Sequence, residues 1–272
     1  MAATSPDEHP SFKEHGVTFP PENPFPSCIL ITGASSGLGR EIAIHLSAHH
    51  RLLLNGRNLQ RLEETRDRCR PAPGGHLIWP FDLLESEAAG GSLEAFLRQH
   101  GALVEAFVHS AALLQILPLR SLTVQMVQAG LNVSVASPVA ILQALMKRKV
   151  NQRQLRNVVF ISSIASQFGA KGFSAYAASK GAMDALMKSL AIELAPEVRV
   201  NSILPGGIQT PMTEGILGDP QMASKFERDY PLGIGEPQDI SEMVEFLLSG
   251  RSRWITGQPF IVDGGRTSNI TA

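Results

Sequence analysis

The sequence has little of what several classes of protein require. It contains only 2 cysteines, Cys28 and Cys69, in 272 residues, which excludes a disulfide framework and a cysteine-based metal site. No apolar run reaches the roughly 18 residues of a membrane span. The first residues are polar and rich in proline, unlike a signal peptide or a membrane anchor. We therefore expect a protein of the reducing cytoplasm with no membrane partner and no metal.

Charge is also scarce. Charged residues make up 18% of the chain, below the usual share of about 25%, and the net charge is -1. A surface with no basic excess does not favour a nucleic-acid partner. Hydrophobic residues reach 43%, enough for a large core, and the low charge predicts that part of the surface forms subunit contacts.

What is present is a regular alternation of apolar runs and helical patterns. Residues 1–27 stand apart, because they contain six prolines and no periodicity; we expect a flexible arm, or one that lies on a neighbouring subunit. Residues 28–272 are predicted to form a single α/β domain, a three-layer doubly wound parallel sheet (a Rossmann fold) of about seven strands with helices on both faces. The predicted strands are 28–32, 52–55, 76–81, 102–108, 158–161, 199–204 and 258–265.

A glycine-rich turn joins the first predicted strand to the first helix. The strand 28–32 is continuously apolar, as in a strand that is buried on both faces. Residues 33–39 follow with Gly33, Gly37 and Gly39, and helical periodicity begins at Arg40. This order brings backbone N–H groups and a helix N-terminus toward a pyrophosphate, so it predicts a dinucleotide site. An ordinary tight turn is the alternative.

The second strand ends in residues that bear on the choice of cofactor. Sites for NAD place an acidic residue there to bind the ribose 2′-hydroxyl, but this chain has Arg57 and Asn58. A guanidinium suits a 2′-phosphate, so we expect NADP(H) rather than NAD(H); a solvated arginine at a helix start is the alternative. Asp82 ends the third strand and either accepts from the adenine amino group or caps the next helix.

Tyr176 and Lys180 lie four residues apart in an alanine-rich stretch that begins a predicted helix ended by Pro196. On a helix both side chains project from one face. A tyrosine hydroxyl titrates near ~10, and a neighbouring ammonium favours the tyrosinate, so we expect Lys180 to lower the pKa of Tyr176 for acid–base chemistry. Many such pairs are merely exposed and have no chemical role.

Two further segments need an explanation. Asn132 lies inside a helix predicted over about 121–149, where asparagine is unfavourable, so it marks either a kink or a water-binding role. Residues 211–231 mix apolar and polar residues beside the ligand edge of the sheet. We predict a mobile substrate lid there, with a plain pair of surface helices as the alternative.

Taken together, these motifs resemble the short-chain dehydrogenase/reductase family, in its single-domain branch and close to 3-oxoacyl-acyl-carrier-protein reductases. Thr32–Gly39 is similar to the cofactor motif of that family, Tyr176-x-x-x-Lys180 to its active-site motif, and residues 262–265 to its C-terminal signature. The resemblance covers everything after the arm and implies Asn132, Ser163, Tyr176 and Lys180 as catalytic residues. The implied cofactor-binding residues are Gly33, Ser35, Ser36, Gly37, Leu38, Gly39, Arg57, Asn58, Asp82, Leu83, Ser110, Ala111, Tyr176, Lys180, Pro205, Gly206, Ile208 and Thr210.

The chain departs from the family pattern after its fourth strand. The family has Asn-Asn-Ala-Gly there, and this chain has His109-Ser110-Ala111-Ala112. Ala112 places a methyl group where the backbone usually lies close to the cofactor ribose. His109 replaces an amide that braces the sheet, and we expect the histidine to be structural rather than catalytic.

The resemblance implies hydride transfer between a nicotinamide, NADP(H) in preference to NAD(H), and a small carbonyl or secondary alcohol, in a homodimer or homotetramer. Ser163 would donate to the substrate oxygen, Tyr176 would exchange its proton, and Asn132 would hold a water that links Lys180 to solvent. A carbonyl reductase is the leading hypothesis. A sugar-type dehydrogenase or epimerase with a tightly held cofactor is the second, and a non-catalytic dinucleotide sensor is the third, although such a sensor has no need of the complete catalytic group.

Overall fold

The computed structural model describes residues 27–211, 213 and 228–269. Nearly all of the predicted N-terminal arm and most of the predicted lid therefore lie outside the described residues.

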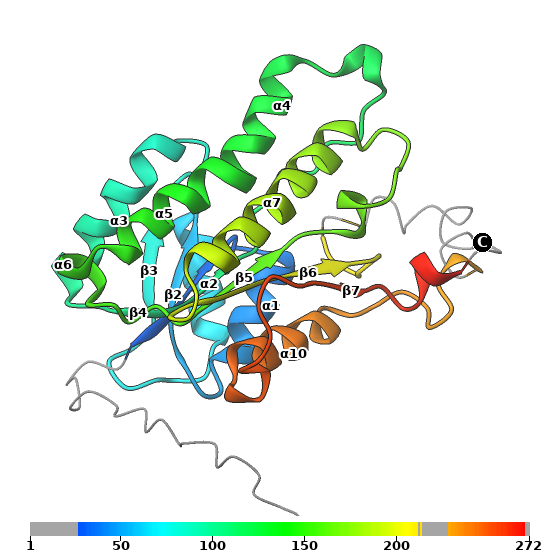
Figure 1. Ribbon diagram of the computed structural model, residues 1–272. Helices are drawn as coiled ribbons and strands as arrows, with labels where there is room; N and C mark the ends of the chain where they lie inside the picture. Colours follow the sequence, from blue (N-terminus) through cyan, green and yellow to red (C-terminus); the bar gives the residue numbers. More distant parts are fainter. Residues whose placement is uncertain (1–26, 212, 214–227, 270–272) are drawn as a thin grey trace, which may run out of the picture.

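Seven strands form one parallel sheet in the order β3-β2-β1-β4-β5-β6-β7 (Figure 1). The chain builds outward from β1 to β3 and then continues from β4 on the other side of β1. The order of the strands thus reverses between β1 and β4, where a doubly wound sheet leaves a crevice for a ligand at its carboxyl edge. The predicted fold class is confirmed. The strands are β1 Cys28–Thr32, β2 Arg51–Gly56, β3 Leu77–Pro80, β4 Val104–His109, β5 Asn157–Ile161, β6 Arg199–Pro205 and β7 Pro259–Val262.

Helices cover both faces of the sheet (Figure 1). One face carries α3 Ser86–His100, α4 Val124–Leu131, α5 Ser137–Met146, α6 Arg148–Asn151 and α7 Ser174–Glu193, and the other carries α1 Gly37–Leu46, α2 Leu59–Arg68 and α10 Pro237–Leu248. Short 3-10 turns span Leu119–Ser121, Ile164–Ser166, Gly250–Ser252 and Arg266–Ser268.

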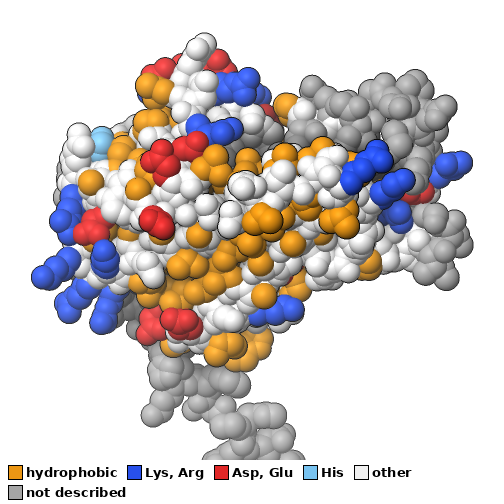
Figure 2. Space-filling view, turned by 90° about the horizontal axis from the view of Figure 1, so that it is seen from above, with side chains coloured by type: hydrophobic (Ala, Val, Ile, Leu, Met, Phe, Trp, Pro, Cys, Tyr) orange, Lys and Arg blue, Asp and Glu red, His pale blue; other side chains and the backbone are white. Residues whose placement is uncertain are grey.

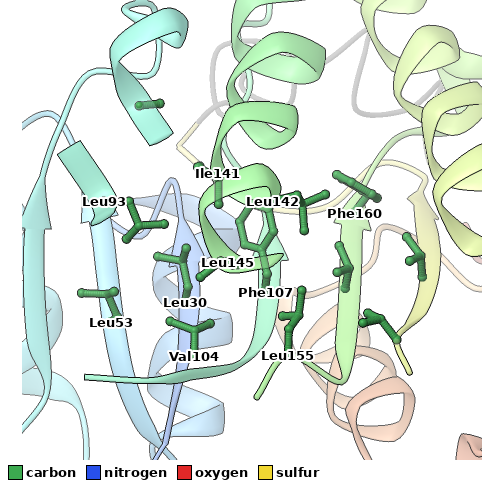
Figure 3. Close-up of a cluster of buried hydrophobic side chains, with 14 of the residues drawn as sticks. Leu30, Leu53, Leu93, Val104, Phe107, Ile141, Leu142, Leu145, Leu155 and Phe160 are labelled. Atoms are coloured by element: carbon green, nitrogen blue, oxygen red, sulfur yellow. The ribbon is translucent and has the colours of Figure 1, made fainter. Parts of the chain in front are cut away.

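Each face of the sheet has its own apolar core, because successive residues of a strand point to opposite sides. In β1, Leu30 joins the core under α3, α5 and α7, whereas Ile29 and Ile31 join the core over α1 and α10. Figure 3 shows the first core, in which Phe107 on β4 lies below Leu142 of α5 and Phe160 on β5 lies to one side of it. A strand buried on both faces explains why its sequence is a continuous apolar run.

The helix predicted over 121–149 is interrupted. It consists of α4, a π-helical turn over Asn132–Ala136, and α5. Thr123 begins α4 by accepting a hydrogen bond from the Met126 amide. Asn132 therefore marks a change of helical geometry, which was the structural alternative for this residue.

The same segment is apolar enough to resemble a membrane span by length and composition. Residues Val124–Met146 have a mean hydropathy of 1.5 over the most apolar window, and 50% of that window is buried inside the protein. A core helix of a doubly wound domain has the same properties, so this is weak evidence for a membrane.

Candidate active site

The glycine turn after β1 is shaped by close backbone contacts. Gly33 has φ +70, and a Cβ there would lie 2.8 Å from the Ala111 amide nitrogen. A Cβ at Gly39 would lie 2.3 Å from the carbonyl oxygen of Gly33. Only glycine fits either position, so the turn is drawn tightly against the end of β4 and the first turn of α1.

The N-terminus of α1 has no side-chain cap. Ser36 occupies the N-cap position in an extended conformation, and its hydroxyl does not accept from the helix. The first N–H groups of a helix need an acceptor and carry the positive end of the helix dipole. This turn therefore has the geometry and the electrostatics of an anion site.

A cavity of about 800 Å³ opens along the carboxyl ends of the central strands, beside this turn. It gathers residues that are far apart in the sequence. Those predicted residues that line it are Gly33, Ser35, Ser36, Gly37, Leu38, Gly39, Arg57, Asp82, Leu83, Ser110, Ala111, Ser163, Tyr176, Lys180, Pro205, Gly206, Ile208 and Thr210.

Two predicted residues lie outside the cavity wall. Asn58 is the N-cap of α2, where its side chain accepts from the Arg61 amide 3.0 Å away, so its oxygen is already used by the helix. Asn132 lies at the junction of α4 and the π-helical turn, and its neighbour Val133 lines the cavity instead. The structure thus brings Ser163, Tyr176 and Lys180 together in the cavity wall, whereas Asn132 is not part of that wall.

Ser163 and the Tyr176–Lys180 pair come from two elements that meet at the cavity. Ser163 follows β5 and caps a 3-10 turn by accepting from the Ala165 amide. Tyr176 and Lys180 lie on successive turns of α7, with the Lys180 nitrogen 5.7 Å from the centroid of the Tyr176 ring. The ammonium donates to the Ile161 carbonyl, 2.7 Å away, at the end of β5.

The pKa of Tyr176 differs from our expectation. Burial raises it above the usual value for tyrosine, and a hydrogen bond with Ser163 partly opposes that rise. The expected lowering by Lys180 was wrong, because the ammonium lies over the ring and donates to a backbone carbonyl rather than to the hydroxyl. Tyr176 is therefore held in its protonated form at neutral pH.

Lys180 is itself strongly perturbed. Its side chain is 1% exposed, and burial lowers its pKa to about 8, while the charge of Asp184 one turn along α7 acts in the opposite direction. A buried ionisable group with a charged neighbour in a cleft is typical of functional sites. At neutral pH this lysine still carries its charge.

Arg57 and Asp82 face one another at the outer end of the cavity. The guanidinium is 3.9 Å from the carboxylate, and the Arg57 side chain is 64% exposed. Asp82 also accepts from the Leu84 amide, 3.0 Å away, which closes a turn ahead of α3, but it does not cap that helix, whose N-cap residue is Glu85. The arginine remains open to a ligand because so much of its side chain faces solvent.

Other residues of the cavity wall did not emerge from the sequence. Asp229 and Arg266 form an ion pair at 3.3 Å, and the Tyr230 hydroxyl accepts from the Gly207 amide at 2.9 Å. The sequence did carry a signal for Arg266, namely the Gly264-Gly265 pair directly before it. Both glycines have positive φ and turn the chain back toward the cavity. Phe168 and Phe173 add apolar surface near Tyr176.

The departure after β4 has two different outcomes. Ala112 lines the cavity. His109 is completely buried as the last residue of β4 and is no part of the cavity wall. The expectation that His109 is structural is confirmed. Within the described ranges, no cluster of three or more His, Cys, Asp or Glu residues is arranged to hold a metal ion.

A doubly wound sheet with a glycine turn at its switch point, facing a Ser-Tyr-Lys group in the same cavity, defines a class of oxidoreductases. The chain belongs to the short-chain dehydrogenase/reductase family: the family profile described as enoyl-(acyl carrier protein) reductase matches residues 33–267.

Relatives with known names agree with that membership. L-xylulose reductase of Bos taurus is 32% identical over 240 residues, covering 87% of this chain and 94% of the relative. Carbonyl reductase [NADPH] 2 of Sus scrofa is 31% identical over 242 residues, with the same coverage of 87% and 94%. Among solved structures, 4-hydroxyisoleucine dehydrogenase complexed with NADH has a TM-score of 0.82 and 28% identity, covering 89% of this chain and 99% of that one.

Proposed function

We propose that this protein is an NADP(H)-dependent oxidoreductase that transfers hydride between the nicotinamide and a carbonyl or secondary alcohol of a small molecule. One observation carries the proposal: Ser163, Tyr176 and Lys180 line the cavity that also contains the glycine turn. The relatives support it, since they include an L-xylulose reductase and an NADPH-named carbonyl reductase. A hydroxylated ketone of the sugar type is therefore the first substrate class to test.

The residues present fit a dinucleotide. At Gly37, which has φ +54, a Cβ would meet nothing closer than the Thr210 Cβ at 3.9 Å, so the turn leaves space beside the uncapped N-terminus of α1 for a pyrophosphate. The exposed guanidinium of Arg57 would hold the ribose 2′-phosphate, because the end of β2 offers no acidic group to a 2′-hydroxyl. Lys180 and the 205–210 loop would hold the nicotinamide end. When bound, the nicotinamide supplies or accepts the hydride.

The catalytic residues then have separate tasks. Ser163 donates a hydrogen bond to the substrate oxygen, where negative charge develops during reduction. Tyr176 gives that oxygen its proton, and its raised pKa keeps the proton in place until it is needed. Lys180 binds the hydroxyls of the nicotinamide ribose, and Asn132 helps to hold the water through which the Tyr176 proton is replaced.

The central experiment is Tyr176→Phe. This change removes the acid while it keeps the ring, so kcat for carbonyl reduction should fall by about 10³-fold or more and the affinity for NADPH should stay within about twofold. NADPH oxidation with a panel of hydroxy-ketones, and fluorescence titration of NADPH, measure the two quantities. Tyr230→Phe removes the other tyrosine hydroxyl of the cavity and should reduce kcat far less. Wild-type turnover in Tyr176→Phe would contradict the proposal.

The cofactor preference has its own test. Arg57→Ala should raise the KM for NADPH by about 10-fold or more, because a charge-assisted contact to the 2′-phosphate is lost, and should change the KM for NADH little. Arg61→Ala, an exposed arginine one turn along α2 that does not line the cavity, is the matched control. An equal loss with both cofactors would assign Arg57 no role in recognising the phosphate.

We also propose a homodimer or homotetramer in the cytoplasm. Figure 2 looks down on the α3–α5–α7 face, where hydrophobic side chains gather in a band between patches of charge. Val124, Met146 and Ile192 are exposed large apolar residues of this layer. The two cysteines are free and buried, so the fold does not depend on an oxidising compartment. Light scattering at several protein concentrations tests the assembly.

A further inference from the structure

His109 is a buried polar side chain that the proposed mechanism does not use. It is 0% exposed and ends the central strand β4. The rings of Phe107 and Phe160 pack edge-on to it, with centroids 5.8 and 6.1 Å away. A polar ring in such surroundings is costly unless its nitrogens are hydrogen-bonded, and both are.

The partners of the two nitrogens fix the protonation of the ring. Nε2 lies 3.0 Å from the carbonyl oxygen of Val133, which can only accept, so Nε2 carries a hydrogen. Burial and the nearby charge of Lys180 lower the pKa of His109 to about 3, so the ring is neutral. Nδ1 then has no hydrogen, and the Thr32 hydroxyl, 2.9 Å away, donates to it.

The Val133 carbonyl needs this donor because of its place in the π-helical turn. In a regular helix it would accept from the amide of residue 137, but that amide donates to the carbonyl of Asn132. The next residue, Pro138, has no N–H to offer. Two side chains replace the missing backbone donor. One is the Ser137 hydroxyl at 2.8 Å from the same helix, and the other is His109 from the sheet.

The other partner of His109 belongs to the cofactor turn. Thr32 is the last residue of β1 and precedes Gly33. Its hydroxyl also accepts a hydrogen bond from the Ala111 amide, 3.4 Å away. The π-helical turn also contacts α7 directly, because the Ser134 hydroxyl donates to the Ser179 hydroxyl, 3.4 Å away. The Ser179 hydroxyl in turn donates to the Tyr176 carbonyl at 2.8 Å. A continuous set of contacts therefore runs from the glycine turn through His109 to the helix of Tyr176.

We propose that His109 is a positioning residue. Its Nε2–H bond to Val133 holds the π-helical turn, and with it Asn132, in the geometry that Asn132 needs to hold its water. The proposal rests on the proposed function, because the role of Asn132 belongs to it. It also gives the family departure a physical meaning. The imidazole spans two partners with one rigid ring, which the amide of an asparagine at this position is too short to do.

Two variants separate the contacts of the ring. The amide of glutamine reaches the position of Nε2, so His109→Gln retains a donor for Val133 and loses the Thr32 contact. The amide of asparagine reaches only the position of Nδ1, so His109→Asn retains the Thr32 contact and loses Val133. We expect kcat of His109→Gln to stay within about threefold of the wild type and that of His109→Asn to fall about tenfold, with the affinity for NADPH unchanged in both.

A double-mutant cycle distinguishes positioning from general weakening. Asn132→Ala should lower kcat, and adding His109→Asn to it should lower kcat no further, because the histidine acts through Asn132. Additive losses, wild-type kcat in His109→Asn, or wild-type kcat in Asn132→Ala would each overturn the proposal. The proposed function has a separate criterion, since it fails if Tyr176→Phe is active.

A measurement on the wild-type protein needs no variant to fold. In protein labelled with ¹⁵N-histidine, the ring of His109 should show the Nε2–H tautomer, with a slowly exchanging hydrogen and no titration between pH 5 and 8. An Nδ1–H tautomer, or titration in that range, would overturn the proposal.

Discussion

The two helical segments that flank the active site hold their residues in different ways. The helix α7 runs for 20 residues without interruption, and its regular spacing alone puts Tyr176 and Lys180 on one face. The segment from α4 to α5 is broken by the π-helical turn, and Asn132 lies at the break. There the Val133 carbonyl accepts from the Ser137 hydroxyl of the same segment and from His109 of the sheet. Helical periodicity is sufficient for the first arrangement, whereas the second needs the whole fold.

The largest effect that sharpens this comparison is expected on α7. Lys180→Met keeps the apolar stem and removes the ammonium, so kcat should fall by about 10³-fold, or about 4 kcal/mol in activation free energy. The stability should change by only about 1–2 kcal/mol, because removal of a buried charge offsets the loss of its hydrogen bond to the Ile161 carbonyl. Steady-state kinetics and thermal unfolding measure the two. A variant that is less stable but still active would mean that Lys180 is structural.

The same variant has a pH signature. Lys180 has a pKa of about 8, so it loses its charge as the pH rises through that value. The wild-type rate of carbonyl reduction should decline there, and the decline should be missing from the residual activity of Lys180→Met.

An intermediate effect is expected at the broken segment and concerns stability in acid. The pKa of His109 is about 3 in the folded protein and about 6.5 in the unfolded chain. Between these values the unfolded state binds the extra proton, so stability falls as the pH falls below about 6.5. At pH 4.5 the loss from this group is about 3 kcal/mol. Urea unfolding at pH 7 and pH 4.5 measures the free energy of unfolding lost in acid, and this loss should be smaller for His109→Gln than for the wild type. An equal loss would show that His109 does not cause the acid sensitivity.

The smallest effect is expected at the outer end of α4. Thr123→Ala removes the hydroxyl that accepts from the Met126 amide and should cost about 1 kcal/mol of unfolding free energy. Thr123→Ser retains the acceptor and should cost much less. Because Thr123 is no part of the cavity wall, kcat should not change. A loss of activity in Thr123→Ala would show that the start of α4 transmits strain through the π-helical turn.

The same contrast explains what could be predicted from the sequence. The sheet, the glycine turn and the Tyr176–Lys180 pair follow from periodicity and local spacing, which any chain with this pattern would share. The raised pKa of Tyr176 could not be predicted, because it depends on burial and on the direction in which Lys180 donates. The N-cap role of Asn58, whose oxygen accepts from the Arg61 amide of α2, is local and could have been predicted. The Asp229–Arg266 pair could not, because its members are 37 positions apart and meet only in the folded chain.

The uncapped start of α1 has a consequence for the persistence of the protein. The N-cap residue of α1 offers no side-chain acceptor to the first N–H groups of the helix. An anionic ligand bound there would accept their hydrogen bonds and so act as the missing cap. A dinucleotide at about 100 times its dissociation constant would add about 2.7 kcal/mol to the free energy of unfolding. The resistance of this protein to heat and to proteases should therefore follow the supply of its coenzyme.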